Sequence, residues 1–570
     1  MRSTRSGRIA ACTALALAAG MILSGPVSAT EKPVPTAKTE RPQHDDRATG
    51  TRPAAPATTK ARVGAAAVTP LLDVDMDGYQ DILYRGLSGK TYLKTFNDTT
   101  DPEFIVSGAA AGSKYDEDFK DVITPGDLDH DGHPELLTLS VDGQLSLLTA
   151  GKYDAQRTGW HGNGWNIYNK VVGAGDLNGD GNADLLARTP GGALYLYPGN
   201  GTANSGSPYG DRISLGGGWD MFSQILGGGD FNSDGKPDLV TVTPSGGLYV
   251  YPGTGNGAFG DRVQSGFGWN MYNQLQLLTS ATGPSWIAAR DQSGTMWGYP
   301  SDGAGGFTDR QKMGTGWEYT DLFAGQGGIA AHGRSELMAR TGDGAVFAYS
   351  GKMNGGFFDR DQVLESGDAP IDLVGMTVAS SFGHQNVSNW LIWGGGQLYS
   401  DNNFVGGGWD IYNSLVGVGD VNGDGLGDLL ARDNSNVMWL YPSIGNGYQF
   451  RDRIRLGAGW GIYNRLLGAG DVTGDGRADL IARGNDGTLW VYPAQGASSF
   501  GDRIQVGSGW NGMNKLAAVG DITGDGLTDI VAVDSSGSGY LYKASGLKGM
   551  NTFGARIALG GGWNAYVDLQ

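Results

Sequence analysis

The chain has 570 residues, of which 100 are glycine and 18% are charged. So much glycine disfavours long helices and favours many short strands joined by tight turns. The formal net charge is −18 at pH 7, and no basic stripe interrupts this acidity, which argues against nucleic acid as a partner.

The N-terminus predicts secretion. Residues 1–29 contain three arginines, an apolar stretch over 9–23 and a small-residue cleavage pattern at 27–29, which is the organisation of a signal peptide. The apolar stretch is too short to span a membrane comfortably, and no other segment is long and apolar enough to do so. The single cysteine, Cys12, lies in this segment, so the mature chain would have no disulfide. We expect a secreted, extracellular protein without a transmembrane segment.

The next segment, residues 30–68, is rich in proline, threonine, alanine and lysine. Such a composition cannot bury enough apolar surface to fold, so the segment is predicted to be a disordered linker. The remaining residues, 69–570, are predicted to form the folded part of the protein.

An acidic loop of nine residues recurs seven times in this folded part, and each copy is followed by a short apolar run. In the third copy, positions 1, 3 and 5 are Asp176, Asn178 and Asp180, position 6 is Gly181 and position 9 is Asp184. Calcium prefers six to eight oxygen ligands, which side chains at alternating loop positions can supply. The glycine permits a positive φ where the loop must turn sharply. The loop is not an EF-hand, because position 12 is alanine and the flanks suit strands.

Calcium is therefore the predicted cofactor. A single such loop is equally well explained as an Asx-rich turn that binds nothing, but seven copies of one plan favour metal. The predicted metal ligands, loop by loop, are Asp73, Asp75, Asp77 and Asp81; Asp127, Asp129, Asp131 and Glu135; Asp176, Asn178, Asp180 and Asp184; Asp230, Asn232, Asp234 and Asp238; Asp420, Asn422, Asp424 and Asp428; Asp471, Thr473, Asp475 and Asp479; and Asp521, Thr523, Asp525 and Asp529.

The third position of the loop changes along the chain from Asp through Asn to Thr. Calcium affinity depends on the number of ligand charges. The loops that begin at Asp471 and Asp521 are therefore predicted to lose calcium first.

The loops mark a larger repeat, which is clearest from Trp409 to Gly459. It opens with a Gly-Trp segment, residues 406–413, and continues with four predicted strands, at 415–419, 428–432, 437–441 and 454–456. Four strands in a tandem repeat of about 50 residues are typical of a β-propeller blade. The sequence thus predicts an all-β protein, a β-propeller of about ten four-stranded repeats, arranged either as a single closed ring or as two propellers.

Some repeats are incomplete. Repeats over about residues 275–400 retain the strands but lose the acidic loop, so they are predicted to be free of metal. The first repeat, from Leu71, has no Gly-Trp segment before it, and the C-terminal Gly-Trp segment at Trp563 has no repeat body after it. We expect these two ends to meet and complete one repeat.

The tryptophans of the Gly-Trp segments are candidate ligand-binding residues. Their rings could stack on sugars, or they could act as wedges that fill the space between neighbouring blades, and a position kept in every repeat favours the wedge. The candidates are Trp165, Trp219, Trp269, Trp409, Trp460 and Trp510. Asp-Arg pairs such as Asp211-Arg212 also recur, and salt bridges between blades or turn caps are favoured for them over ligand binding.

No catalytic residue is assigned. The sequence has no metal-spaced histidine pair, no Gly-x-Ser-x-Gly elbow and no phosphate-binding loop. The predicted protein is a binding protein rather than an enzyme, although the question of activity stays open because propellers also carry enzymes.

These features together resemble the FG-GAP/VCBS repeat family, which includes integrin α-type propellers and bacterial and fungal propeller lectins. The resemblance rests on the acidic loops, on the Gly-Trp segments at Trp165 and Trp269, and on Phe-Gly pairs at Phe259, Phe500 and Phe553. It covers residues 69–570 and implies a propeller with calcium in its loops and an extracellular role in binding carbohydrate or surfaces.

The resulting hypothesis is a secreted, calcium-binding, lectin-like propeller for cell-envelope or extracellular glycans. The alternatives are an adhesion scaffold of the integrin α type for cell-surface proteins, and a polysaccharide lyase or hydrolase built on a propeller. The oligomeric state and the binding face stay open.

Overall fold

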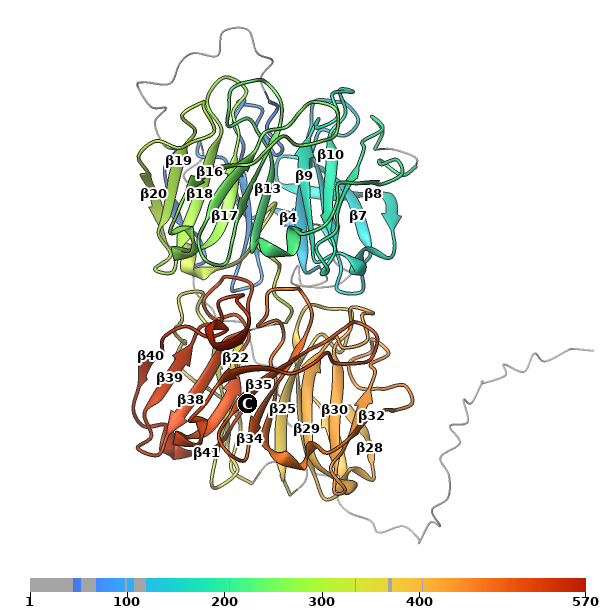
Figure 1. The fold of residues 1–570 in the computed structure, drawn as a ribbon, viewed down its shortest axis with the longest axis vertical. Helices are drawn as coiled ribbons and strands as arrows, with labels where there is room; N and C mark the ends of the chain where they lie inside the picture. Colours follow the sequence, from blue (N-terminus) through green and yellow to red (C-terminus); the bar gives the residue numbers. More distant parts are fainter. Residues whose placement is uncertain are drawn as a thin grey trace, which may run out of the picture. The chain divides into compact units, whose positions relative to one another are not determined.

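The structure, a computed structural model, consists of short β-strands and three-residue 3₁₀ turns in the residues that it describes, which are 45–52, 68–97, 100–106, 119–203, 206–333, 335–367, 372–401 and 403–570. These strands form ten sheets. Figure 1 shows two sets of sheets, one in blue to green and one in yellow to red. The first set, which we call the first half, ends at Phe323, and the second half begins at Glu336.

The first half has five sheets. Their strands, in the order of pairing, are β21 (Thr320–Phe323), β2 (Ile82–Gly86) and β3 (Thr91–Lys94); β5 (Asp121–Gly126), β6 (Glu135–Leu139), β7 (Leu145–Ala150), β8 (Asp154–Gly162) and β4 (Ile105–Val106); β9 (Lys170–Gly175), β10 (Asp184–Arg188), β11 (Leu194–Tyr197) and β12 (Ile213–Ser214); β13 (Gln224–Gly229), β14 (Asp238–Val242), β15 (Leu248–Tyr251) and β16 (Val263–Gly266); and β17 (Tyr272–Leu278), β18 (Trp286–Asp291), β19 (Met296–Pro300), β20 (Gln311–Thr315) and β1 (Thr49–Gly50).

The second half also has five sheets. Their strands are β41 (Tyr566–Leu569), β22 (Glu336–Thr341), β23 (Val346–Ser350) and β24 (Asp361–Leu364); β25 (Gly375–Ser380), β26 (Ser388–Gly394), β27 (Gln397–Ser400) and β28 (Asn403–Gly407); β29 (Tyr412–Gly419), β30 (Asp428–Asp433), β31 (Val437–Tyr441) and β32 (Ile454–Ala458); β33 (Tyr463–Gly468), β34 (Asp479–Gly484), β35 (Leu489–Pro493) and β36 (Ile504–Gly507); and β37 (Met513–Ala518), β38 (Ile530–Asp534), β39 (Gly539–Tyr542) and β40 (Ile557–Gly560).

The repeat that the sequence predicts from Trp409 to Gly459 is confirmed, because its four predicted strands correspond to β29, β30, β31 and β32. Each sheet is a blade of a β-propeller, in which neighbouring strands run antiparallel except for the short edge strand β4, which pairs in parallel with β8. The protein is therefore all-β, as the glycine content and strand pattern predicted.

The incomplete repeats are not paired as expected. We expected the C-terminal Gly-Trp segment to complete the first repeat, but β21 pairs with β2 and β41 pairs with β22. The first repeat thus takes its missing strand from the chain that follows Trp317, and the C-terminal strand completes the repeat at Glu336. In each half, the last strand along the chain thus completes the first sheet of the same half, which divides the ten repeats into two sets of five.

The first strands of neighbouring blades lie against one another. In the first half β5, β9, β13 and β17 are in contact in that order. Gly325 N–H donates to Val122 O at 2.8 Å, and Gly327 N–H donates to Leu275 O at 3.1 Å, which links the chain after β21 to β5 and to β17. In the second half β25, β29, β33, β37 and β41 follow one another in the same way.

Glycine is what allows this close approach. A Cβ added to Gly173 in β9 would lie 2.2 Å from Thr124 O, and one added to Gly468 in β33 would lie 1.7 Å from Gly417 O. Such distances are impossible for a side chain, so at these two points the neighbouring first strands come this close only because the residue is glycine.

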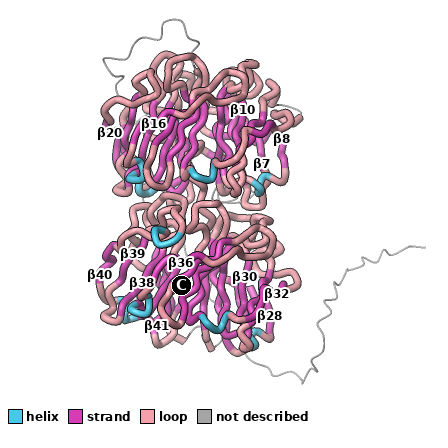
Figure 2. Tube along the Cα trace, in the orientation of Figure 1, coloured by secondary structure: helices cyan, strands magenta, loops and turns pink. Residues whose placement is uncertain are grey.

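Short 3₁₀ turns begin at the tryptophans of the Gly-Trp segments (cyan in Figure 2). They are η1 (Trp165–Ile167), η2 (Trp219–Met221), η3 (Trp269–Met271), η4 (Trp317–Tyr319), η5 (Trp409–Ile411), η6 (Trp460–Ile462), η7 (Trp510–Gly512) and η9 (Trp563–Ala565), with one further turn, η8 (Gly549–Asn551), outside these segments. No helix in the described part of the chain has the length and apolarity needed to cross a membrane.

The predicted signal peptide (1–29) and most of the predicted linker (30–68) lie outside the described residues. Within the linker, residues 45–52 are described, and Thr49 and Gly50 pair with Thr315 and Gly314 of β20. This short part of the segment therefore adds an edge strand to a blade.

Candidate metal centre

Six of the seven acidic loops join the first strand of a blade to the second, and the loop at Asp73 instead precedes β2 directly. In each loop the first carboxylate organises the turn. In the loop between β9 and β10, Asp176 Oδ1 accepts hydrogen bonds from Gly179 N–H at 2.7 Å and Asp180 N–H at 3.0 Å. Its Oδ2 accepts one from Gly181 N–H at 2.9 Å. Gly181 has a φ of 93°, which is the left-handed conformation that the sequence predicted for position 6.

The carboxylate at position 9 lies at the start of the second strand or directly before it, and it is buried. Asp184 Oδ2 accepts hydrogen bonds from Leu177 N–H at 3.0 Å and Asn178 N–H at 3.1 Å, while Oδ1 accepts one from Gly199 N–H at 2.8 Å. This carboxylate therefore connects its loop to the chain that follows the third strand of the blade.

Burial raises the pKa of these position-9 carboxyls. The pKa is raised to about 8 for Asp81, Glu135 and Asp428, to about 7 for Asp238 and to about 6 for Asp184. For Asp479 and Asp529, burial and the neighbouring loop carboxylates raise the pKa well above its ordinary value. A buried carboxylate needs a compensating cation to remain ionised at neutral pH.

Several of these oxygens have no hydrogen-bond partner in the described part of the chain. The orphaned buried atoms in the loops are Asp81 Oδ1, Asp127 Oδ1, Glu135 Oε1, Asp479 Oδ1, Thr473 Oγ1 and Thr523 Oγ1. Native proteins rarely leave such atoms unsatisfied, so each one needs an explanation. Acceptors without donors, gathered beside other carboxylates, suit a cation.

Two loops bring three acidic side chains close enough to share one ion. The ligand atoms of Asp73, Asp75 and Asp81 all lie within 4.8 Å of one another, and the same holds for Asp127, Asp129 and Glu135. The donor set is made of oxygen only, which is the preference of hard divalent cations. The residues present therefore fit a metal ion of this class.

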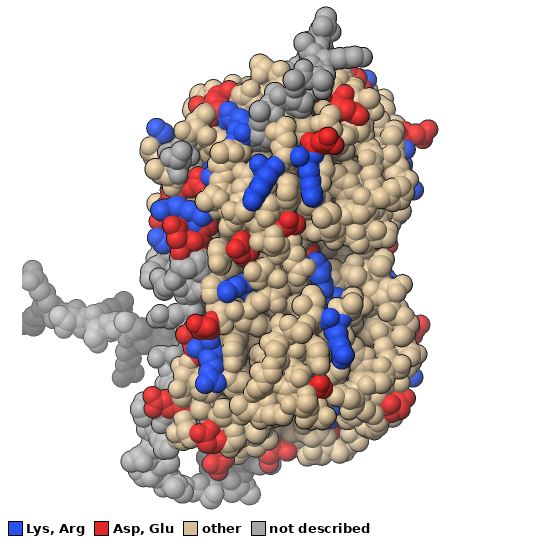
Figure 3. All heavy atoms as spheres, turned by 90° about the vertical axis from the view of Figure 1, so that its left-hand side faces the viewer, with Lys and Arg blue, Asp and Glu red and all other residues tan. Residues whose placement is uncertain are grey.

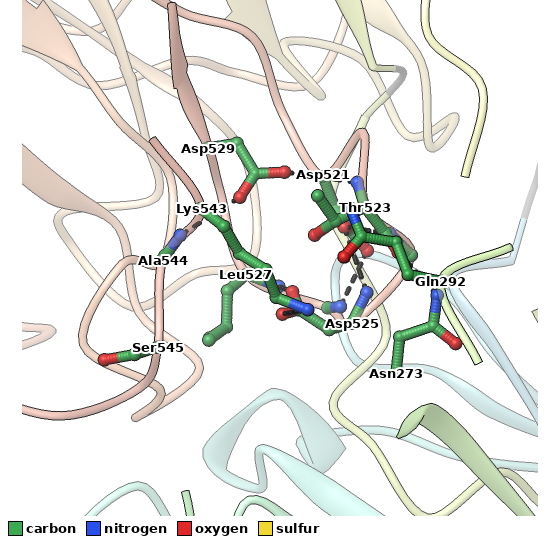
Figure 4. Close-up of polar contacts among 12 residues, drawn as sticks. Asn273, Gln292, Asp521, Thr523, Asp525, Leu527, Asp529, Lys543, Ala544 and Ser545 are labelled. Atoms are coloured by element: carbon green, nitrogen blue, oxygen red, sulfur yellow. Dashed lines mark hydrogen bonds and ion pairs between the residues drawn. The ribbon is translucent and has the colours of Figure 1, made fainter. Parts of the chain in front are cut away.

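The seven loops differ in their surroundings. In the last loop, Lys543 Nζ lies 3.1 Å from Asp525 Oδ2 (Figure 4). In the first loop, Arg52 Nη2 lies 2.7 Å from Asp77 Oδ2. At these two positions a protein cation already contacts the carboxylate at position 5.

The fifth repeat, which was predicted to be free of metal, has a neutral turn in place of the acidic loop. Ser280 Oγ accepts hydrogen bonds from Thr282 N–H at 3.3 Å and Gly283 N–H at 3.0 Å. A hydroxyl thus accepts the backbone hydrogen bonds of this turn in place of a carboxylate, and the turn carries no negative charge.

The tryptophans of the Gly-Trp segments lie between blades. Trp219 packs with Leu186 and Leu196 of the preceding sheet and with Ile225 of its own. Of the six candidates, Trp165, Trp219, Trp269, Trp409 and Trp510 are at most 9% exposed, and Trp460 is half-buried. Each ring centre lies 4.5–5.0 Å from that of a tyrosine at the end of a third strand, the partners being Tyr197, Tyr251, Tyr299, Tyr441, Tyr492 and Tyr542. This is the wedge arrangement, and it leaves little ring face for a sugar.

The arginines of the Asp-Arg pairs have aromatic partners where we expected salt bridges or turn caps. The Arg212 guanidinium lies 4.4 Å from the centre of the Tyr195 ring, and its Nη1 donates to Tyr168 Oη at 2.5 Å. Arg310 and Arg503 repeat this contact 4.1 Å from the ring centres of Trp297 and Trp490. The alternation of aromatic residues in the third strand places a ring beneath each arginine, and a cation prefers that face.

A second set of arginines, at the ends of the second strands, was not predicted from the sequence. Arg188 donates from Nη1 to Trp219 O at 3.1 Å and Phe222 O at 2.5 Å in the next Gly-Trp segment, and from Nε to Asn169 Oδ1 at 3.0 Å. Arg290, Arg432 and Arg483 make the same three kinds of bond. The signal was a recurring Ala-Arg pair, which begins at Ala187, Ala289, Ala431 and Ala482.

The three acidic loops of the second half contact the first half, within the compact unit that spans Val34–Gln570. Asn166 Nδ2 donates to Gly423 O at 2.7 Å, and Asn169 Nδ2 donates to Asp475 O at 2.7 Å. A cavity of about 460 Å³ lies beside these contacts, and Asp420, Asp471 and Asp521 are among its lining residues.

Charged side chains of both signs are scattered over the face shown in Figure 3, and they form no continuous band of one sign there. The concentrated negative charge of the chain is in the loops described above.

Comparison with known proteins places these loops in a family. The family model described as an FG-GAP-like repeat matches residues 127–187, 420–482 and 471–532, and the FG-GAP repeat model matches 170–209 and 222–259. No curated protein matches the chain.

Similar solved structures are distant. A crystal structure of BBS1N in complex with ARL6DN, soaked with lead, is 13% identical with a TM-score of 0.21, and the match covers 54% of this chain and 87% of that one. The BP39L lectin from Burkholderia pseudomallei is 12% identical with a TM-score of 0.18, and that match covers 78% of this chain and 98% of the lectin. The family-model matches fall on acidic loops and their flanking strands in both halves, and these segments of the chain are FG-GAP repeats.

Proposed function

We propose that the seven acidic loops bind Ca²⁺ and that the bound ions stabilise the propeller blades. The observation that carries this proposal is the set of buried, orphaned oxygens, above all those of Asp81, Glu135 and Asp479. A divalent cation would satisfy these oxygens and would offset the burial and repulsion that raise the pKa of their carboxyls.

Calcium fits this donor set better than the other common metals. The ligands are carboxylate, amide and hydroxyl oxygens, whereas zinc and copper favour histidine and cysteine. Magnesium is smaller and requires near-ideal octahedral geometry with several waters. A loop of oxygen donors, with Asp, Asn or Thr accepted at position 3, suits the variable coordination of calcium.

Isothermal titration calorimetry tests the proposal. We expect seven equivalents of Ca²⁺ for the full chain, one for each loop, and six for Asp184→Asn, which removes the charge at position 9 of the third loop. Asp211→Asn is the matched control, because Asp211 is an exposed aspartate outside the loops. Calorimetry without measurable heat for the full chain would refute the proposal.

We further propose that the calcium-bound propeller binds carbohydrate outside the cell. Because the tryptophans of the Gly-Trp segments are largely buried, another aromatic side chain would have to supply the stacking surface. Phe267 is 79% exposed and precedes η3, where Met271 is 54% exposed. An exposed aromatic ring with an apolar neighbour in the same Gly-Trp segment supports a stacking site for a sugar ring.

A glycan array tests this second proposal. The full chain should bind with calcium, lose binding with a chelator, and bind more weakly as Phe267→Ala. Phe404→Ala is the control, because Phe404 is 54% exposed on β28 in the second half. An array that stays blank with calcium present overturns the carbohydrate proposal and favours a protein partner.

The extracellular location is part of the proposal. It is supported by the signal-like pattern of residues 1–29 and by the lack of a cysteine after Cys12, since calcium is abundant outside cells. Expression of the full chain in a secreting host, followed by N-terminal sequencing, should give a mature chain that begins near residue 30. Retention of an uncleaved chain inside the cell would contradict secretion.

A further inference from the structure

The seven loops fall into two classes by their contacts. Loops of the second half approach the first half so closely that glycine is required. A Cβ added to Gly476 would lie 2.4 Å from Asn169 Cβ, and one added to Gly425 would lie 2.0 Å from Val141 O. The same position in two first-half loops, Gly132 and Gly181, has no atom within 4 Å. Position 6 of the loop therefore faces packed atoms of the first half in these second-half loops, and it faces open space at Gly132 and Gly181.

Glycine at position 4 is found in all three second-half loops and in one first-half loop. Position 4 is Gly423, Gly474 and Gly524 in the second half, and Met76, His130, Gly179 and Ser233 in the first half. At Gly524 an added Cβ would lie 2.3 Å from Arg290 Nη2. At Gly524 the loop is thus adapted to the surface of the first half, whereas at Gly423 and Gly474 the nearest atoms belong to Gly496 and Gly546 of the second half.

The neighbouring surface contacts the loop backbone through hydrogen bonds. Asn273 Nδ2 donates to Thr523 O at 2.6 Å (Figure 4), and Arg290 Nη2 donates to Gly524 O at 2.7 Å. With the bonds to Gly423 O and Asp475 O described above, contacts of this kind reach all three second-half loops. The accepting carbonyls belong to loop positions 3, 4 and 5, among the side chains that would hold the metal.

We infer that calcium in the three second-half loops holds the two halves of the protein together. This inference rests on the proposed calcium binding. The positions of the carbonyls that Asn169, Asn273 and Arg290 contact depend on the loop conformation, and the ligands of one ion would fix that conformation. The hydrogen bonds described above for a first-half loop, such as the one from Gly199 N–H to Asp184, come from its own half, so calcium there would serve its own blade.

The coupling must act in both directions. If calcium favours docking of the halves, docking raises the calcium affinity of the same three loops by the same factor. The seven sites would then separate into a class of three that depends on docking and a class of four that does not.

The protein contains its own control for this inference. The pairs Asn413–Arg432 and Asn464–Arg483 of the second half repeat the Asn–Arg bond of the first half, at 2.8 Å and 2.7 Å. Their amides donate to Asp433 O at 3.1 Å and Gly484 O at 3.4 Å, which lie within their own sheets. The same substitution can therefore be made at an asparagine that bonds a loop of the other half and at one that bonds its own blade.

The test compares Asn169→Asp/Asn273→Asp with Asn413→Asp/Asn464→Asp in the full chain. An aspartate keeps an acceptor for the arginine but replaces the amide donor by a negative charge that faces a carbonyl and an acidic loop. Hydrogen-exchange mass spectrometry during a calcium titration reports the occupancy of each loop, and small-angle X-ray scattering reports the separation of the halves.

The expected result has three parts. In the full chain, calcium removal raises the radius of gyration. In Asn169→Asp/Asn273→Asp, the loops starting at Asp471 and Asp521 need about fivefold more calcium, or still more, for half-maximal protection from hydrogen exchange. The loops starting at Asp127 and Asp176 reach half-maximal protection at the same calcium concentration as in the full chain. In Asn413→Asp/Asn464→Asp, none of these values changes.

Two outcomes would overturn the inference: a radius of gyration that does not respond to calcium, or equal effects of the two double variants. Failure of the calcium proposal itself looks different, because no loop would then gain protection from calcium in any variant.

Discussion

Arg188 in one blade donates a hydrogen bond of 2.5 Å to the carbonyl oxygen of Phe222 in the next. Arg188 is 1% exposed, and burial lowers its pKa to about 10. Its guanidinium reaches two carbonyls of the next Gly-Trp segment and one asparagine, so neighbouring blades are joined by polar contacts as well as by the tryptophan wedge. Arginine suits this role because its planar fork presents several donors in a fixed geometry.

Replacement of this arginine should destabilise the protein. Arg188→Ala leaves the Trp219 and Phe222 carbonyls without their donor in a buried place, and we expect a loss of about 3 kcal/mol in the free energy of unfolding, measured in urea. Arg188→Lys should recover only part of this loss, since one ammonium cannot reproduce the fork. Arg455→Ala, at an exposed arginine of β32, is the control; similar losses at both positions would contradict the role of the bond.

Removal of calcium should lower the melting temperature. A ligand that binds only the folded state stabilises it by about 2.7 kcal/mol per site when its concentration is 100 times Kd. No disulfide can compensate in a mature chain that lacks Cys12. Differential scanning calorimetry with calcium and with a chelator measures the effect, and magnesium in excess over the chelator should not restore the transition. Identical melting temperatures in all conditions would refute the role of calcium.

Without calcium, the protein should become less stable as the pH rises. The pKa of Asp81 is raised from 3.8 to about 8 and that of Asp238 to about 7, so these carboxyls bind protons more tightly in the folded state. The stability that protonation provides is complete below pH 3.8 and is lost as the pH rises toward 8. Urea unfolding of chelated protein between about pH 4 and pH 8 checks this sign. A calcium-free stability that increases over that range would contradict the burial of these carboxyls.

Substitution of two neighbouring aromatic residues should affect stability and glycan binding separately. Trp269 is 6% exposed and its ring centre lies 4.5 Å from that of Tyr299, so Trp269→Ala should cost about 3–5 kcal/mol of stability. Phe267→Ala should leave the unfolding free energy unchanged within about 0.5 kcal/mol and weaken glycan binding. The comparison fails if the exposed phenylalanine proves to be the one that stabilises the fold.

A negative charge added at position 3 should raise the calcium affinity of a loop that is predicted to bind weakly. Thr473 is 4% exposed and its hydroxyl is orphaned among the described residues, while the first two loops have aspartate at this position. Thr473→Asp should lower the calcium concentration that half-protects this loop by about tenfold, which corresponds to about 1.4 kcal/mol. Unchanged or weaker protection would show that ligand charge does not set the order in which the loops empty.

Local features of the fold were predictable because each depends on a few neighbouring residues. The strands from Tyr412 to Ala458 and the positive φ of Gly181 follow from apolar runs and from the fixed spacing of the loop. The buried place of Asp184 could not be predicted from the loop, because it depends on the chain after the third strand, which covers it.

The division into two sets of five repeats could not be predicted from the sequence. All Gly-Trp segments are followed by similar strands, so any of these strands fits the edge of any second strand. Local sequence therefore does not distinguish the pairing of β21 with β2 from a pairing of β41 with β2. The choice depends on how many blades fit side by side, which is a property of the assembled sheets. The contacts of Asn169 and Asn273 with the second half depend on this choice as well.

The pairing of β2 with β21 also sets an order of events during synthesis. Residues 82–86 leave the ribosome long before residues 320–323, which supply the strand that covers them. Until then one edge of β2 has no partner, and an open strand edge invites pairing with other chains. Contacts so distant along the chain also form slowly. A chain truncated before Thr320 would expose that edge permanently.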